Sequence, residues 1–206
     1  MKKCFIIAGG DFDGFYDAIG KEDFVIAADK GYTYTRNSGI SCDLIIGDFD
    51  SSDMPKESDV IKLNPIKDYT DTKAAMMIAK EKGFREIIIY GSLGGRESHT
   101  IANIKASLEY KKEGIDVRLK SKDKTLFIID KSFTYEFKDE EDFYVSIFSL
   151  SEISKNVSIK GLYYELNNYD MTIFDSLGVS NETVNRNFTI SLEDGYLLLI
   201  FEKKNS

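Results

Sequence analysis

The first part of the chain alternates short apolar runs with segments of helical pattern. Several runs are apolar at successive positions, without the apolar–polar alternation of a strand that has one face in water. Strands covered on both faces have this pattern, which is typical of a parallel sheet flanked by helices. The sequence therefore predicts the α/β class, with an open, mostly parallel sheet. The expected strands are Cys4–Ala8, Phe24–Ala28, Leu44–Ile46, Val60–Leu63, Glu86–Tyr90 and Val117–Leu119.

Two of the intervening segments carry clear helix signals. Thr70 or Asp71 can cap a helix that runs to about Lys82, with Gly83 as its stop. A second helix is expected to open near Ser98, because an apolar stripe at helical spacing follows. The stripe and its stop are Ile101, Ile104, Leu108 and Gly114.

After about Lys120 the pattern changes to short strand-like pieces without a convincing helix. Strands at this spacing, with Gly and Asn turns between them, predict an antiparallel β-sandwich. We expect the boundary near Ser121, with domains at residues 1–121 and 122–206. The expected strands of the second domain are Leu126–Ile129, Phe133–Phe137, Tyr144–Phe148, Val157–Ile159, Phe188–Ile190 and Tyr196–Phe201.

Charge and composition narrow the classes of function. The chain has 42% hydrophobic and 30% charged residues and a net charge of −8. Nucleic-acid binding is not expected, because a polyanion needs a basic face and no run of Lys and Arg is long enough to form one. The charge favours a cationic ligand or a nucleotide chelated by magnesium.

The location expected from the sequence is the cytoplasm. Cys4 and Cys42 have no paired spacing, so neither a disulfide framework nor a zinc site is expected, and both are interpreted as reduced thiols. The first apolar run ends at Gly9, too early for an export segment. No apolar stretch is long enough to span a bilayer, so no membrane partner is expected.

Carboxylates follow three of the expected strands. Asp48 and Asp50 stand in a turn directly after one strand, Asp29 follows another, and a third group, Asp68 and Asp71, lies where a strand passes into a helix. Taken alone, the Asp48–Asp50 pair could equally cap a helix or face water. Because the carboxyl ends of parallel strands share one crevice, acids far apart in sequence can meet there. Such a site suits Mg²⁺ and therefore phosphate chemistry.

A glycine-rich stretch, residues 91–99, lies between an expected strand and an expected helix. Backbone amides at this position can cradle phosphate. The stretch does not match a P-loop, since it lacks the Gly-Lys-Ser or Gly-Lys-Thr ending. Arg96 adds a fixed cation. His99, the only histidine, is interpreted first as a helix-start hydrogen-bonding residue and second as a phosphate contact.

Taken in order, these residues and two C-terminal motifs resemble the thiamine pyrophosphokinase family. Each motif is loose, but six of them in the right order form a specific signal that spans nearly the whole chain. The motifs stand here as Ala28-Asp-Lys-Gly31, Gly47-Asp-Phe-Asp-Ser51, Asp68-Tyr-Thr-Asp71, Gly94-Gly-Arg-Glu-Ser-His-Thr100, Gly161-Leu-Tyr-Tyr-Glu-Leu166 and Gly178-Val-Ser-Asn-Glu182. Two positions depart from the family pattern. Ser98 replaces an Asp, leaving a good helix cap, and Lys30 replaces a Gly.

The resemblance implies an N-terminal catalytic, nucleotide-binding α/β domain and a C-terminal thiamine-binding sandwich. It also implies a homodimer with substrate sites near the subunit interface, and the conversion of ATP and thiamine into AMP and thiamine diphosphate. The implied metal ligands for Mg²⁺ are Asp48, Asp50 and Asp71, with Asp68 or Asp71 as the possible proton acceptor. The implied shell of ATP and its phosphates is Asp29, Thr70, Lys73, Arg96 and His99, and the implied thiamine contacts are Ser180 and Asn181.

Two other functions stay open from the sequence. Asp48-Phe-Asp50 also fits the Asp-x-Asp pattern of metal-dependent nucleotide-sugar glycosyltransferases. Ser98, in place of a carboxylate, also leaves room for a non-catalytic sensor that binds thiamine or a nucleotide.

Overall fold

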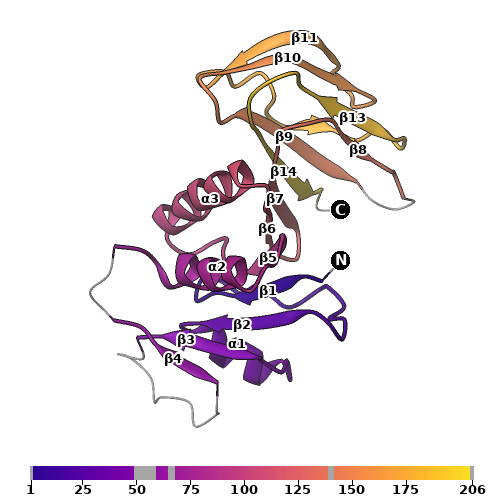
Figure 1. Cartoon of the computed structure of the whole chain (residues 1–206). Helices are drawn as coiled ribbons and strands as arrows, with labels where there is room; N and C mark the ends of the chain where they lie inside the picture. The colour runs from indigo at the N-terminus through magenta and orange to yellow at the C-terminus, as the bar shows by residue number, and fades with distance from the viewer. Residues whose placement is uncertain (1, 49–58, 65–67, 139–141, 205–206) are drawn as a thin grey trace. The chain divides into compact units, whose positions relative to one another are not determined.

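The computed structural model describes residues 2–48, 59–64, 68–138 and 142–204. Its contacts group into two compact units, Met1–Lys122 and Asp123–Ser206 (Figure 1), which divide next to the boundary expected near Ser121. Each unit has its own apolar core, so each is described by itself.

The first unit contains six parallel strands in the order β4-β3-β2-β1-β5-β6. The predicted open parallel sheet is therefore confirmed. The chain builds outward from β1 on one side and then returns to add β5 and β6 on the other. The strand order thus reverses between β1 and β5, and ligands bind at such a point in open α/β sheets. The strands are β1 (Cys4–Ile7), β2 (Phe24–Ala28), β3 (Leu44–Gly47), β4 (Val60–Lys62), β5 (Glu86–Tyr90) and β6 (Asp116–Lys120).

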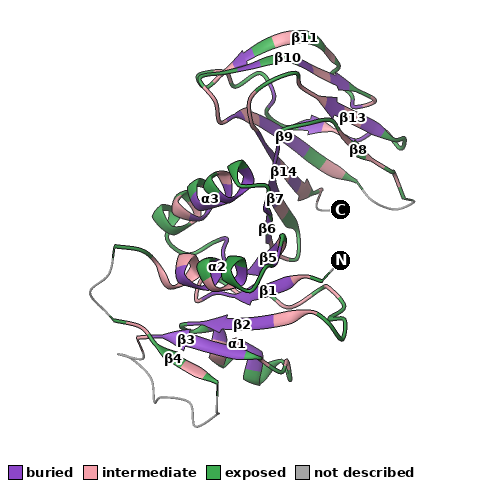
Figure 2. Cartoon of the chain, viewed as in Figure 1, coloured by how far each residue is buried: buried purple, intermediate pink, exposed green. Residues whose placement is uncertain are grey.

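Helices cover both faces of this sheet, as the apolar runs of its strands require. Helices α2 (Asp71–Glu81) and α3 (Glu97–Lys112) lie on one face and α1 (Gly31–Asn37) on the other. The central strands are buried, whereas the outer surfaces of the helices are exposed (Figure 2). None of the helices in the described ranges is both long and apolar enough to cross a membrane.

The helix boundaries correct one prediction from the sequence. Thr70 is the N-cap of α2, and its Oγ1 accepts a hydrogen bond from the Lys73 amide at 3.2 Å, as predicted. The N-cap of α3 is Arg96, which makes no side-chain cap bond. The prediction that Ser98 caps this helix is wrong, because the helix starts at Glu97 and Ser98 already lies within its first turn.

The second unit is the predicted antiparallel β-sandwich. One layer pairs the strands in the order β12-β9-β14-β7 and the other in the order β11-β10-β13-β8. Apolar side chains from both layers, among them Ile147, Val157 and Phe188, form one core. The strands are β7 (Lys124–Ile129), β8 (Phe133–Tyr135), β9 (Phe143–Ser149), β10 (Ile153–Lys160), β11 (Leu166–Thr172), β12 (Asn181–Glu182), β13 (Phe188–Ser191) and β14 (Leu197–Lys203).

Candidate active site

A cavity of about 550 Å³ opens where the strand order of the first unit reverses. Its walls are the segments that follow β1, β2 and β5, the first turn of α2, and residues of α1 and α3. Of the site residues predicted from the sequence, five line it: Asp29, Thr70, Asp71, Arg96 and His99. The cavity therefore brings together acids and bases from segments far apart in sequence.

Glycines form the wall between β1 and β5. The Gly10 amide donates to the Gly91 carbonyl at 2.9 Å, and a Cβ on Gly91 would lie 2.4 Å from the Ala8 carbonyl oxygen. Gly91 also has a φ of +64°. Both the contact and the backbone conformation exclude a side chain at this position. The two strand-end segments can therefore approach closely and expose backbone to the cavity.

Negative charge gathers next to this wall, where a Cβ on Gly9 would lie 2.7 Å from Asp29 Oδ2. Asp29 has a φ of +54°, and its amide donates to the Ile46 carbonyl at 2.9 Å. Burial, followed by the charges of Asp71 and Asp48, raises the pKa of the Asp29 carboxyl, and Lys30 offsets the rise only in part. Asp29 thus lies close enough to two carboxylates from other segments to be repelled by both, which favours a cation near it.

The predicted metal ligands are only partly described. Asp71 lines the cavity, and Asp48 is half-buried directly after β3. Asp50 lies outside the described residues. Within the described ranges, no three Asp, Glu, His or Cys side chains converge closely enough to form a metal site by themselves. Carboxylate oxygens are nevertheless the ligand type that Mg²⁺ takes.

Groups suited to anions lie at the start of α3. Arg96 and His99 line the cavity, and the His99 amide donates to the Arg96 carbonyl at 2.9 Å. Because α3 has 16 residues and no side-chain cap, its positive end is available to a ligand beside the glycine loop. The cavity can therefore bind a phosphate group and a cation side by side.

Two predicted residues of the first unit lie elsewhere. Asp68 and Lys73 line a separate groove between α2 and α3, and neither lines the cavity. Lys73 Nζ pairs with Glu109 Oε2 at 2.7 Å. Its predicted role as a phosphate contact has no support from this geometry.

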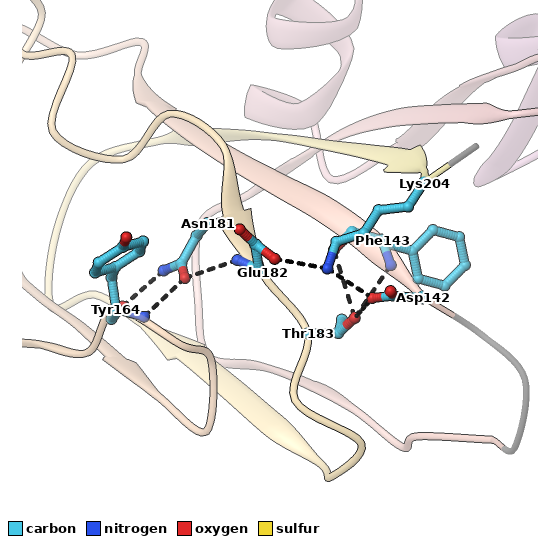
Figure 3. A network of polar contacts seen from close by, with 7 residues as sticks. All are labelled: Asp142, Phe143, Tyr164, Asn181, Glu182, Thr183 and Lys204. Atoms are coloured by element: carbon cyan, nitrogen blue, oxygen red, sulfur yellow. Dashed lines mark hydrogen bonds and ion pairs between the residues drawn. The ribbon is translucent and has the colours of Figure 1, made fainter. Parts of the chain in front are cut away.

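The predicted thiamine contacts Ser180 and Asn181 belong to the second unit. Asn181 is 4% exposed, and its side chain bonds to backbone on both sides (Figure 3). Its Oδ1 accepts from the amides of Tyr164 and Glu182, each at 2.9 Å, and its Nδ2 donates to the Tyr164 carbonyl at 2.6 Å. Asn181 thus fixes the turn that carries Tyr163 and Tyr164, whereas Ser180 is exposed beside it.

Comparison with known proteins assigns both units to one family. The model of the thiamin pyrophosphokinase catalytic domain matches residues 15–119, and that of the thiamin pyrophosphokinase vitamin B1 binding domain matches residues 134–197. This chain belongs to the thiamine pyrophosphokinase family. The thiamine pyrophosphokinase of Bacillus subtilis is 31% identical to it, over 97% of this chain and 98% of that protein.

Solved structures with thiamine pyrophosphokinase folds agree with the architecture. The Bacillus subtilis structure superposes with a TM-score of 0.86 at 28% identity, covering 98% of this chain and 100% of that one. The structure from Geobacillus thermodenitrificans gives 0.84 at 26% identity, with 99% of each chain covered. The structure from Candida albicans, 18% identical over 98% of this chain and 89% of that one, shares the fold with a TM-score of 0.73.

The family motif Ala28-Asp-Lys-Gly31 has a physical explanation. Lys30 has a φ of −58°, which any residue adopts, so a lysine can stand where the family usually has Gly. Gly31 is different, because a Cβ there would lie 1.8 Å from the Ile7 carbonyl oxygen. The lysine that departs from the thiamine pyrophosphokinase pattern at position 30 is therefore free of backbone strain, while the motif's last glycine, Gly31, is sterically required.

Sequence reasoning missed several residues of the cavity wall. Gly9, Gly10 and Asp11 follow β1, Tyr34 comes from α1, and Asn103 comes from α3. The signal for the first group was present, since a Gly-Gly-Asp turn follows an apolar strand just as the predicted acids do. Assigning this turn to the site required knowing that β1 and β5 are neighbours in the sheet. Asn103 is buried and donates to the Ser92 carbonyl at 2.9 Å, which stabilises the glycine loop.

Proposed function

We propose that this chain transfers the pyrophosphoryl group of ATP to the hydroxyl of thiamine, giving thiamine diphosphate and AMP. The observation that carries the proposal is the cavity at the sheet's reversal point, which is lined by a helix start, a glycine loop and the carboxylates of Asp29 and Asp71. The match to both domains of the thiamine pyrophosphokinase family, over nearly the whole chain, supplies the substrate pair.

In the proposed reaction the thiamine hydroxyl oxygen attacks the β-phosphorus of ATP and AMP leaves. Arg96 and the backbone amides near the start of α3 hold the phosphates, so that the reacting atoms are positioned before bonds change. Asp71 is the better candidate for accepting the hydroxyl proton, because it lines the cavity and Asp68 does not. Asp29 and Thr70 complete the wall on that side.

We further propose that Asp48, Asp50 and Asp71 hold Mg²⁺. The residues present fit such an ion, because Asp71 and Asp48 offer carboxylate oxygens, the ligand type that Mg²⁺ takes, and both lie near enough to Asp29 to act on its carboxyl. When bound, Mg²⁺ neutralises charge on the transferred group. The proposed cellular location is the cytoplasm.

One assay separates this function from its rivals. Incubation with thiamine, ATP and Mg²⁺ should yield AMP and thiamine diphosphate in equal amounts, resolved by chromatography. Release of ADP in place of AMP would contradict direct pyrophosphoryl transfer. Turnover of a UDP-sugar without turnover of ATP would favour the glycosyltransferase reading of Asp48-Phe-Asp50, and thiamine binding without any nucleotide product would favour a sensor.

If the segment around Asn181 contacts thiamine, replacing Asn181 should change the KM for thiamine alone. Asn181→Ala removes the three hydrogen bonds that fix the Tyr163–Tyr164 turn. The rings of Tyr163 and Tyr164, which are 65% and 63% exposed, are suited to binding a cationic thiazolium. We expect the KM for thiamine to rise about tenfold, since lost buried hydrogen bonds cost roughly 1–2 kcal/mol, while the KM for ATP stays unchanged. Steady-state kinetics with each substrate varied measures this.

The matched control is Asn187→Ala. Asn187 Oδ1 accepts from the Phe137 amide at 2.9 Å, also in the second unit, but serves a different turn. It should leave both KM values unchanged. An equal rise for thiamine and ATP in the Asn181 variant would point to general unfolding and would contradict the assignment.

The proposed homodimer can be tested by the molecular mass of the protein in solution. Within the described residues, exposed large apolar side chains gather between β11 and β12, and Phe174 is 91% exposed. A patch of this kind marks an interaction site. The wild type should have about twice the 23.4 kDa chain mass by light scattering, and Phe174→Asp should shift it to 23.4 kDa. Ile101→Asp, on an exposed site of α3, should stay dimeric, and a monomeric wild type would contradict the proposal.

A further inference from the structure

The connection from β1 to β2 has no regular structure. The two strands are parallel neighbours, and such a pair needs a crossover, which is usually a helix. Here residues 8–23 form neither helix nor strand. A connection of this length without secondary structure is uncommon and is often functional. Because it has no hydrogen-bond ladder of its own, other parts of the unit must hold it in place.

Two aspartates fasten the first half of this crossover to segments that follow other strands. Asp11 Oδ2 accepts from the Gly95 amide at 2.9 Å, and Asp13 Oδ2 accepts from the Lys122 amide at 2.8 Å. The first bond joins the crossover to the glycine loop after β5. The second joins it to the residues after β6. Both lie at the carboxyl ends of the strands, where the cavity opens.

A third aspartate makes the most enclosed attachment. Tyr90 Oη donates to Asp17 Oδ2 at 2.5 Å, and Lys120 Nζ lies 2.9 Å from Oδ1 and 2.8 Å from Oδ2. The Asp17 and Lys120 side chains are only 22% and 23% exposed. Burial alone would raise the pKa of the Asp17 carboxyl, but the hydrogen bonds from Lys120 and Tyr90 outweigh it and lower the pKa. The carboxylate is therefore ionised at neutral pH and holds both partners.

This attachment acts on the phosphate wall through the chain itself. Tyr90 is the last residue of β5, and Gly91, which lines the cavity, follows it directly. The Tyr16 amide donates to Tyr90 Oη at 3.3 Å, and the Phe15 ring packs on Tyr90 with centroids 4.7 Å apart. The crossover therefore holds Tyr90 from several sides.

The same crossover reaches the cavity at a second point. The Phe12 ring stacks on Tyr34 with centroids 5.1 Å apart, and Tyr34 lines the cavity. Asp11, Asp13 and Asp17 thus fix a segment that supports the Gly9–Gly10 wall, the glycine loop and α1 together.

We propose that Asp17 is a positioning residue for the ATP phosphates, acting through Tyr90 and Lys120 on the Gly9–Gly10 and Gly91–Arg96 walls. The inference rests on the proposed function, because it takes the cavity as the ATP site. Asp17 does not line the cavity, so its effect passes through the backbone that does.

The test compares Asp17→Ala with Asp23→Ala. Asp23 belongs to the same crossover and accepts hydrogen bonds from the amides of Lys3 and Gly20, at 2.7 and 2.8 Å, but it stands just before β2, at the opposite end of the strands from the cavity. We expect Asp17→Ala to raise the KM for ATP and the calorimetric Kd for ATP about tenfold or more, because small misplacements of binding groups are costly. The KM for thiamine should not change.

Tyr90→Phe provides a second variant that keeps the ring and removes only the hydroxyl. It should raise the KM and Kd for ATP in the same direction, by about threefold, since the Lys120–Asp17 pair remains. Asp23→Ala should leave both constants at the wild-type values. If Asp17→Ala does not fold, as judged by circular dichroism, Tyr90→Phe decides the question.

Two results would overturn the inference. One is a fall in kcat in proportion to the folded fraction, with the KM and Kd for ATP unchanged. The other is the same rise in the KM for ATP in Asp23→Ala as in Asp17→Ala. Failure of the proposed function would look different, because the wild type would bind ATP and release no AMP. The Kd comparison would then still decide the role of Asp17.

Discussion

Asp71→Asn is expected to lower kcat for AMP formation about a thousandfold or more. Asp71 lines the cavity at the first position of α2, and its charge reaches Asp29 across the site. The substitution keeps the size of the side chain but removes a ligand charge proposed for Mg²⁺ and the proposed proton acceptor. Losing one preorganised electrostatic group typically costs about two to three orders of magnitude in rate. Single-turnover assays of AMP release at saturating ATP and thiamine measure the effect.

The same variant should keep its stability. Removing the Asp71 charge weakens its interaction with the positive end of α2, which is worth roughly 0.3–1 kcal/mol. It also removes the repulsion between Asp71 and Asp29, which, after burial, contributes to the raised pKa of the Asp29 carboxyl. Because the two effects oppose each other, we expect the free energy of unfolding in urea, without Mg²⁺, to change by less than about 1 kcal/mol.

Asp68→Asn is the matched control for Asp71. Both acids belong to one four-residue motif, but Asp68 is exposed and lines the groove between α2 and α3. It should retain at least about half of the wild-type kcat, since surface substitutions away from such a site have small effects. Equal losses in the two variants would contradict the assignment of Asp71. So would an Asp71→Asn variant with wild-type kcat.

The strands of the first unit were predictable because burial on both faces leaves a strong local signal. Phe24–Ala28 and Glu86–Tyr90 have the predicted bounds. Helix α1 was missed because its seven residues include Gly31 and two threonines, which are weak helix formers. Strand β11 was missed for a similar reason, since asparagine and aspartate are depleted in strands and occupy three of its seven positions.

Site residues could be predicted only where the sequence indicated the carboxyl end of a strand. Asp29 and Asp71 followed from that rule, and both line the cavity. Asp11 obeys the same rule, but the neighbours of β1 depend on strand order, which no local pattern specifies. The environment of Lys73 could not be predicted either, because its partner Glu109 lies on another helix and is found only through helix packing.

Gly31→Ala is expected to cause the largest loss of stability, more than about 3 kcal/mol. A Cβ at this position would lie 1.8 Å from the Ile7 carbonyl oxygen and 2.6 Å from its carbonyl carbon. Ile7 is a buried residue in the middle of the sheet, so the backbone of β1 cannot move away without disturbing both neighbouring strands. Overpacking of a well-packed interior typically costs 1–3 kcal/mol, and a clash with backbone lies at or beyond the upper end of roughly that range.

Helix α1 must therefore shift outward in this variant, and the shift should also reach the site. Gly31 directly follows Asp29 and Lys30, and Tyr34 lies about one helical turn after it. Asp29, Lys30 and Tyr34 line the cavity. Urea unfolding measures the stability, and Gly39→Ala is the control. Gly39 has a φ of +67° but nothing within 4 Å of an added Cβ, so strain without a clash should cost about 1 kcal/mol. Equal losses in the two variants would show that α1 can move freely over β1, and would remove the steric explanation for the glycine of this motif.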